Sequence, residues 1–217
     1  MRYSTVLFDL DGTLIDSIEL ILSSYRHTMQ IHRGDPMADD LWIAGLGTPL
    51  RVQFTHFTDD PAEIEAMIAT YREHNIANHD RMVTAYPGAL DTLKALKAAG
   101  TKLGIVTSKN DHGLARGMDL CGFNGLFDSL VTCDTLPESK PDPAPVRRAL
   151  QDLGADAKTT LFVGDSPHDM AAGQSAGTDT AACLWGPFTK AQLEPERPTW
   201  WLESFADLAR VSGIATS

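Results

Sequence analysis

The chain is short of positive charge. Its 217 residues include 18 lysines and arginines against 29 aspartates and glutamates, which gives a formal net charge of -11 at pH 7. Nucleic acids and anionic membranes attract clustered Lys and Arg, so we expect neither as a partner. An anionic ligand would have to be captured locally, by a metal ion or by a few hydrogen-bond donors, against the field of the whole molecule.

Cysteines and long apolar runs are also scarce. Cys121, Cys133 and Cys183 are far apart in the sequence and odd in number. This pattern is typical of free thiols in a reducing compartment rather than of a disulfide framework or a zinc site. No uninterrupted apolar run approaches the length of a membrane span. The first apolar segment begins close to Met1, which leaves no room for a signal peptide. These absences predict a cytoplasmic protein.

The composition can nevertheless build a sizeable core, because 43% of the residues are hydrophobic and 22% are charged. After residue 87, segments typical of helices alternate with segments typical of strands. The helix-like segments are 90–100, 113–122, 143–154 and 204–211, and the strand-like segments are 102–109, 128–134, 159–169 and 179–186. Such alternation predicts an α/β fold with a doubly wound, mostly parallel, Rossmann-like sheet.

The stretch 18–85 breaks this alternation. Its four recognisable segments, 18–29, 38–46, 48–57 and 61–79, are all typical of helices and carry little strand signal. We therefore predict a small all-helical cap domain at 18–85, inserted after the first strand, and a core domain made of 1–17 and 86–217. Asp16 lies just before the first cap helix and is expected to be its N-cap.

The first strand ends in two carboxylates. In "YSTVLFDLDGTLIDS", the apolar residues before Asp9 are typical of a buried parallel strand. Side chains at positions i and i+2 of a strand point to the same side, so Asp9 and Asp11 are expected to lie together. Two carboxylates that lie so close together raise each other's pKa unless a cation or hydrogen-bond donors balance their charge.

Other polar residues follow the later strands. Thr107 and Ser108 end one of them, Asp165 ends another, and Asp169 and Lys140 lie nearby in "GDSPHD" and "SKPDP". In open parallel sheets, ligands bind beyond the carboxyl ends of the strands, near the point where the strand order reverses. Carboxylate and carbonyl oxygens suit Mg²⁺, which often shares its shell with a phosphate. Magnesium and Lys140 together could balance the acidic residues.

Four motifs in this order carry a resemblance to a known family. "DLDGTL" at 9–14, "VTSK" at 106–109, "KPDP" at 140–143 and "GDSPHD" at 164–169 resemble the four motifs of the haloacid dehalogenase superfamily. The helical insert is similar to the cap of its phosphoglycolate phosphatase-like branch. The resemblance covers the whole chain and implies a Mg²⁺-dependent phosphatase.

The resemblance also implies residue roles. Asp9 would attack phosphorus to form an aspartyl-phosphate, and Asp11 would protonate the leaving oxygen and later activate water. The side chains of Asp9 and Asp165, with the backbone carbonyl of Asp11, would hold Mg²⁺. Thr107 would hold the phosphoryl oxygens together with nearby backbone N–H groups, while Lys140 would neutralise charge around phosphorus.

Four further residues receive candidate roles. Leu10 and Ser108 are predicted to bind substrate beside Thr107. Arg51, in the cap segment "GLGTPLR", is a candidate contact for a second anionic group, although a solvated helix residue has the same pattern. Asp169 would orient Lys140 or a metal-bound water, and it could equally be an acidic residue in the first turn of a helix.

The substrate is left open between phosphoglycolate and pyrophosphate. Parts of the cap and the stretch 168–182 are similar to bacterial pyrophosphatases of the same branch, whereas the general scaffold fits phosphoglycolate phosphatases. A sugar phosphomutase and a non-enzymatic phosphoacceptor or binding protein stay as alternatives. A phosphonate hydrolase of the superfamily needs a cap lysine, and 18–85 contains none. A monomer and a homodimer are both compatible with the sequence.

Overall fold

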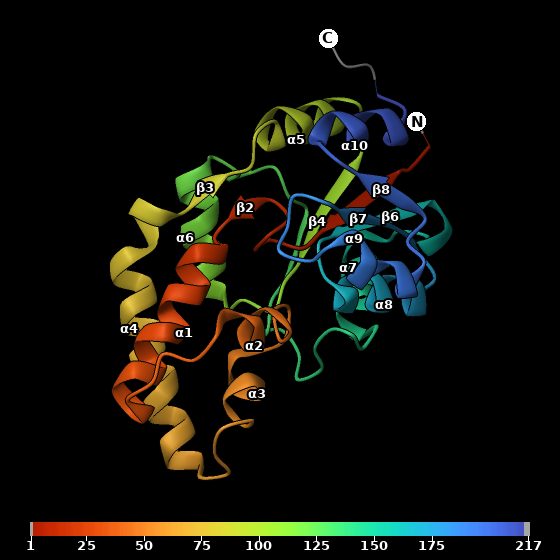
Figure 1. The fold of residues 1–217 in the computed structure, drawn as a ribbon. Helices are drawn as coiled ribbons and strands as arrows, with labels where there is room; N and C mark the ends of the chain where they lie inside the picture. The colour runs from red at the N-terminus through yellow and green to blue at the C-terminus, as the bar shows by residue number, and fades with distance from the viewer. Residues whose placement is uncertain (1, 215–217) are drawn as a thin grey trace.

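The computed structural model describes residues 2–214 and contains a six-stranded parallel sheet at its centre (Figure 1). The strands are β1 (Thr5–Phe8), β4 (Lys102–Val106), β5 (Ser129–Val131), β6 (Thr160–Gly164), β7 (Asp179–Cys183) and β8 (Trp200–Leu202). They lie in the order β5-β4-β1-β6-β7-β8, and each neighbouring pair is parallel. The strand order reverses at β1, so the predicted doubly wound, Rossmann-like fold is confirmed.

The central strand is buried on both sides. Val6, Leu7 and Phe8 have no exposed surface. Val6 and Phe8 belong to one hydrophobic cluster, whereas Leu7 belongs to another, because successive side chains of a strand point to opposite faces. A continuous apolar run is therefore what a strand needs when helices cover both faces of its sheet.

Helices cover the two faces of the sheet. The helices of the core are α5 (Ala89–Ala98), α6 (Asp111–Cys121), α7 (Ala144–Leu153), α8 (Pro167–Ala176), α9 (Lys190–Leu193) and α10 (Phe205–Ser212). Short 3-10 helices occur at η1 (Ala157–Thr159) and η2 (Glu194–Glu196). Helices α5, α6 and α10 bury side chains in the cluster that contains Val6, and α7 and α8 bury side chains in the cluster that contains Leu7. In Figure 1, α5 and α10 lie side by side at the top of the sheet.

Four helices lie between β1 and α5 in the chain. They are α1 (Ile18–Arg33), α2 (Asp39–Ile43), α3 (Leu50–Phe54) and α4 (Pro61–Met82). Tyr25 of α1 stacks on Trp42 of α2, with ring centroids 4.2 Å apart and an interplanar angle of 4°, and Phe54 of α3 packs edge-on against both rings. The helices thus share an aromatic core of their own. The division into a cap at 18–85 and a core at 1–17 and 86–217 stays a prediction.

A two-stranded antiparallel ribbon joins the helical insert to the sheet. It pairs β2 (Ile15–Asp16) with β3 (Thr84–Ala85), so the two chain crossings lie side by side. The strand at β3 was not predicted, since two residues are too few to show alternation. The prediction for Asp16 is wrong: Ser17 is the N-cap residue of α1, and Asp16 is an exposed residue of β2. Among residues 2–214, no helix has the length and apolarity that a membrane crossing requires.

Trp42 tests the importance of the aromatic core in the insert. Its side chain is 1% exposed, so Trp42→Ala should lower the free energy of unfolding by about 3–5 kcal/mol through lost burial and the cavity left behind. Leu41 is the matched control, because it is the neighbouring residue in α2 but is 55% exposed. Denaturant unfolding of both variants measures the difference, and equal effects would contradict the packing described here.

Candidate active site

Three neighbouring strands deliver polar residues to one edge of the sheet. Asp9 follows β1, Thr107 follows β4 and Asp165 follows β6, and β1 lies between the other two strands. The backbone N–H of Asp9 donates to the carbonyl of Val163 at 2.9 Å, which continues the ladder one residue beyond β1. The parallel register therefore brings these strand ends together, as the sequence predicted for a ligand site.

Three carboxylates form a buried cluster at this edge. Asp9, Asp165 and Asp169 are 5%, 3% and 0% exposed, and each offers an oxygen within 4.8 Å of the others. Oδ1 of Asp9 is buried, and the partner described for it is the ammonium group of Lys140, 2.9 Å away. A buried set of oxygen donors fits a hard cation such as Mg²⁺.

Within residues 2–214, Lys140 is the cation that forms ion pairs with this cluster. Its Nζ lies 2.9 Å from Oδ1 of Asp9, donates to Oδ1 of Asp169 at 2.6 Å, and also donates to the carbonyl of Val106 at 3.2 Å. The residue is only 2% exposed. A lysine is rarely buried to this degree unless its charge is paired, so the acidic cluster explains its position.

The cluster contains more negative charge than Lys140 can balance. Burial raises the pKa of Asp9 to about 7, with a further contribution from Asp169, while Lys140 opposes the rise. Burial also raises the pKa of Asp165 well above its ordinary value, and the charges of Asp169 and Asp9 add to this effect. Burial alone would lower the pKa of Lys140, but Asp169 and Asp9 raise it. A divalent cation would supply the missing positive charge.

Asp169 has two kinds of contact. Besides the bond to Lys140, its Oδ2 accepts from the backbone N–H and the hydroxyl of Ser166, at 3.0 and 2.6 Å, in a capping box that begins α8. The two roles considered for Asp169 are thus compatible, because one oxygen caps a helix while the other contacts Lys140. Gly164 makes this approach possible, since a Cβ there would lie 2.4 Å from Cβ of Asp169.

Asp165 is held by residues that the sequence analysis did not assign to it. The hydroxyl of Thr13 donates to Oδ1 of Asp165 at 2.6 Å. Two glycines make room for the carboxylate: a Cβ on Gly12 would lie 2.6 Å from its Oδ2, and a Cβ on Gly186 would lie 2.4 Å from its Cβ. Gly12 and Thr13 belong to "DLDGTL", so the motif carried a signal for them, whereas Gly186 lies in a loop after β7 with no such signal.

Asp11 lies outside this cluster and has partners of its own. Nζ of Lys109 donates to its two oxygens at 2.8 and 3.0 Å, and the hydroxyl of Ser17 donates to Oδ1 at 2.6 Å. Ser17 is the N-cap residue of α1, yet its side chain makes no capping bond and contacts Asp11 instead. The sequence analysis missed both partners, although Lys109 ends the quoted motif "VTSK".

The strand ends open into a cavity of about 430 Å³ shared with the helical insert. Asp9, Asp11, Thr107, Ser108 and Asp165 line it from the core, and residues of α1, α3 and α4 line it from the insert. The hydroxyl of Ser108 donates to the carbonyl of Gly47 at 2.6 Å, so this predicted substrate contact instead joins the core to the α2–α3 loop.

The side chains of two predicted substrate-binding residues, Arg51 and Leu10, contact other parts of the protein. Arg51 lines the cavity, but its guanidinium forms an ion pair with Glu65 of α4. The side chain of Leu10 has no exposed surface and packs in the hydrophobic core. Only the backbone of Leu10 is therefore available to a ligand, and its N–H already interacts with the carboxylate of Asp9.

The fold and the cluster define an α/β enzyme that places carboxylates and a lysine at the carboxyl ends of its parallel strands. The chain belongs to the haloacid dehalogenase-like hydrolase family, whose model matches residues 6–183. The pyrophosphatase PpaX of Bacillus velezensis is 39% identical over 213 residues, which cover 98% of each chain. The PpaX of Halalkalibacterium halodurans is 38% identical over 214 residues, which cover 99% of each chain.

Solved structures agree with this family. A predicted phosphoglycolate phosphatase from Haemophilus somnus superposes with a TM-score of 0.89 at 26% identity, covering 98% of this chain and 99% of that one. A hydrolase from Pseudomonas syringae superposes with a TM-score of 0.88 at 22% identity, covering 98% of this chain and all of that one, and supports the fold alone. The predicted family and the prediction of a phosphatase are confirmed.

Thermal unfolding with and without Mg²⁺ tests the acidic cluster. Because the pKa of Asp9 rises from 3.8 to about 7 on folding, the metal-free protein should lose stability as pH rises through this window. Above this pH window Mg²⁺ no longer competes with protons for Asp9, so the metal-induced stabilisation should be larger at pH 8 than at pH 5. It should reach about 2.7 kcal/mol when the metal concentration is about 100 times its Kd.

Asp165→Asn is the control for this measurement, because it removes one charge of the cluster but keeps an oxygen that can accept from Thr13. It should abolish most of the Mg²⁺-induced stabilisation at pH 8. Equal stabilisation at the two pH values, or the same stabilisation in the variant, would contradict a metal site at this cluster.

Gly186→Ala tests the close approach to Asp165. The added methyl group would have to displace Asp165, and a shift of about 1 Å at such a site can cost about 10²-fold in rate. We expect kcat to fall on this scale while the protein stays folded. Gly117→Ala is the control, since its Cβ would meet only the ends of two side chains, Ile15 at 3.2 Å and Leu10 at 4.0 Å, and alanine favours a helix. A variant at Gly186 with the original kcat would show that the approach is unimportant.

Proposed function

We propose that the chain is a Mg²⁺-dependent phosphatase that hydrolyses a small anionic phosphate through an aspartyl-phosphate on Asp9. The observation that carries the proposal is the buried cluster of Asp9, Asp165, Asp169 and Lys140 at the carboxyl ends of the strands, of which Asp9 and Asp165 line the cavity. Family membership makes a hydrolase the class to which this chemistry belongs.

In the first step, a carboxylate oxygen of Asp9 attacks phosphorus and the bond between phosphorus and the leaving oxygen breaks. Asp11 donates a proton to that oxygen, so the leaving group departs with one negative charge fewer. In the second step, water attacks the phosphorus of the aspartyl-phosphate while Asp11 accepts its proton, and phosphate leaves with the Asp9 carboxylate restored. Both aspartates line the cavity, where they can reach one bound ligand.

The surrounding groups stabilise charge on the transferred phosphoryl group. The side chains of Asp9 and Asp165, with the carbonyl of Asp11, would hold Mg²⁺, which when bound supplies positive charge to the phosphoryl oxygens. Lys140 holds Asp9 in place through the ion pair at 2.9 Å and is itself oriented by Asp169. Thr107 follows β4 at the cavity wall, where its hydroxyl can donate to a phosphoryl oxygen.

Pyrophosphate is the first candidate substrate and phosphoglycolate the second. Relatives named as pyrophosphatases are 38–39% identical over nearly the whole chain, which favours pyrophosphate. The Haemophilus somnus structure, at 26% identity, favours phosphoglycolate. Both substrates carry a second negatively charged group beyond the transferred phosphoryl group, so for either one the cavity must accommodate a second anionic group.

Phosphate release from a panel of substrates tests the function. We expect Mg²⁺-dependent release from pyrophosphate or phosphoglycolate, faster than from sugar phosphates or a nucleotide, and its loss with excess chelator. Asp9→Asn should reduce kcat by at least about 10³-fold, because it removes the nucleophile. Asp16→Asn is the control, since Asp16 is an exposed carboxylate in β2. Substantial turnover by the Asp9 variant, or activity that survives the chelator, would contradict the mechanism.

A further inference from the structure

Both carboxylate oxygens of Asp11 accept hydrogen bonds from neighbouring side chains. Lys109 bridges the two oxygens at 2.8 and 3.0 Å, and Ser17 adds a third hydrogen bond at 2.6 Å. The side chains of Lys109 and Asp11 are 13% and 20% exposed, so this ion pair is more sheltered than a surface pair. Charge-assisted hydrogen bonds in such surroundings are stronger than those between neutral groups.

This arrangement conflicts with the role proposed for Asp11. A general acid and base must bring a carboxyl oxygen within hydrogen-bond distance of the leaving oxygen. A general acid needs a proton on one of its oxygens, and an ammonium group that bridges both oxygens competes with that proton for the same sites. Asp11 therefore acts most readily when Lys109 turns to another partner.

The position of Lys109 limits what that partner can be. Its backbone N–H donates to the hydroxyl of Thr107 at 3.2 Å, and its carbonyl accepts from the N–H of Cys133 at 3.2 Å, so the backbone is fixed beside the proposed phosphoryl site. Its side chain passes close to Gly113, where a Cβ would lie 2.8 Å from Cε of the lysine. Lys109 pairs with Asp11 and also lines the cavity, so an anion bound in the cavity is a partner to which its ammonium group can turn.

Two other cations line the cavity and differ from Lys109. Arg51 is paired with Glu65 of α4, away from the carboxylates of the core. Arg72 also lines the cavity, and no carboxylate within residues 2–214 forms an ion pair with it. Of these three cations, Lys109 is the one whose present partner is the proposed general acid and base.

We infer that Lys109 exchanges Asp11 for a negatively charged group on the leaving part of the substrate, and that this exchange selects substrates whose leaving group is an anion. The inference rests on the proposed function and names the substrate class of the same site. A second phosphate or a carboxylate can replace the Asp11 carboxylate as the partner of the ammonium group. A neutral leaving group cannot, and leaves Asp11 bridged by Lys109.

A matched pair of substrates isolates this effect. Phosphoglycolate and 2-hydroxyethyl phosphate transfer the same phosphoryl group and have leaving parts of similar size, but only the first carries a carboxylate there. Pyrophosphate is measured beside them as a second substrate with an anionic leaving group. We expect the wild-type kcat/KM to be on the order of 10- to 100-fold higher for phosphoglycolate or pyrophosphate than for 2-hydroxyethyl phosphate.

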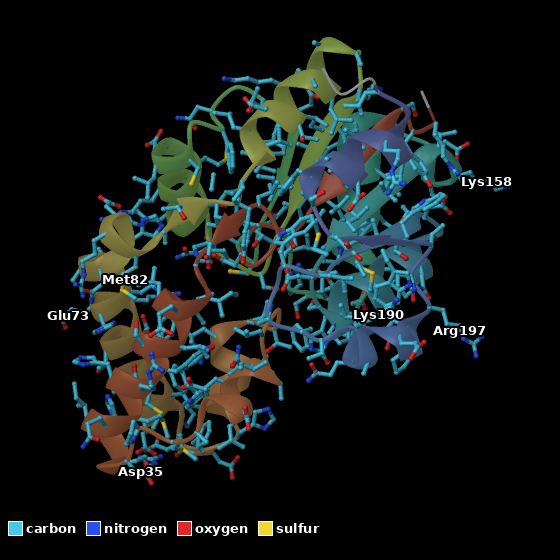
Figure 2. All side chains as sticks on the ribbon, turned by 45° about the horizontal axis from the view of Figure 1, so that its top comes forward. Asp35, Glu73, Met82, Lys158, Lys190 and Arg197 are labelled. Carbon is cyan, nitrogen blue, oxygen red and sulfur yellow. The ribbon has the colours of Figure 1, made fainter. Side chains whose placement is uncertain are left out.

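Lys109→Gln should lower this ratio to within about threefold of unity, because the amide carries no charge for either partner. Lys109→Arg should retain a clear preference for the anionic leaving group, since the charge is kept. Lys158→Gln is the control: Lys158 lies at the surface of the core, on the side away from the cap helix that carries Glu73 (Figure 2), and its loss should leave the ratio unchanged. Thermal unfolding of each variant is measured in parallel.

Several outcomes would overturn the inference about Lys109 without affecting the proposed function. They are a wild-type enzyme with no preference for the anionic leaving group, a Lys109→Gln variant that keeps the wild-type ratio, and a loss of the ratio in Arg72→Gln instead. If Lys109→Gln fails to fold, the wild-type ratio and Lys109→Arg still decide the matter. In all these cases Asp9→Asn remains inactive and the proposed function stands. If the wild type releases no phosphate from any substrate, or Asp9→Asn stays active, the proposed function fails and the inference fails with it.

Discussion

The burial of excess negative charge at the carboxyl ends of β1 and β6 is the constraint on which the rest of the site depends. Asp9, Asp165 and Asp169 are at most 5% exposed, and Lys140 is the cation paired with them among residues 2–214. Carboxylates are stable in such surroundings only when cations or hydrogen-bond donors compensate for the water they have lost. The remaining need for positive charge is what makes the cluster suited to a divalent cation and to a phosphoryl group bound beside it.

The groups that compensate for the buried negative charge belong to segments that also determine the fold. Asp169 begins α8 through its capping box with Ser166, so the residue that orients Lys140 also starts a helix on the sheet. Asp165 accepts from Thr13, and the backbone of Gly12 and Gly186 passes too close to Asp165 for a side chain to fit at either glycine. Fold and site are thus coupled, since a shift of these segments would move the carboxylates as well.

The strand ends were the predictable part of the site. Asp9, Thr107 and Asp165 could be brought together from the sequence, because consecutive apolar runs imply a parallel sheet and a parallel sheet aligns its carboxyl ends. Lys109 and Ser17 were not predicted as partners of Asp11. Lys109 is 98 residues from Asp11 in the chain, and Ser17 matches the pattern of an ordinary N-cap, so neither carried a local signal for this contact.

The sequence by itself determined the α/β class, the helical insert and the residue types of the motifs, because hydrophobic periodicity and turn residues act over a few neighbouring positions. Only the tertiary structure decided which charges pair. It assigned Lys140 to Asp9 and Asp169, Lys109 to Asp11, and Arg51 to Glu65. The physical reason is that ion pairing depends on distance and burial in space, and these follow from the packing of segments that are remote in the chain.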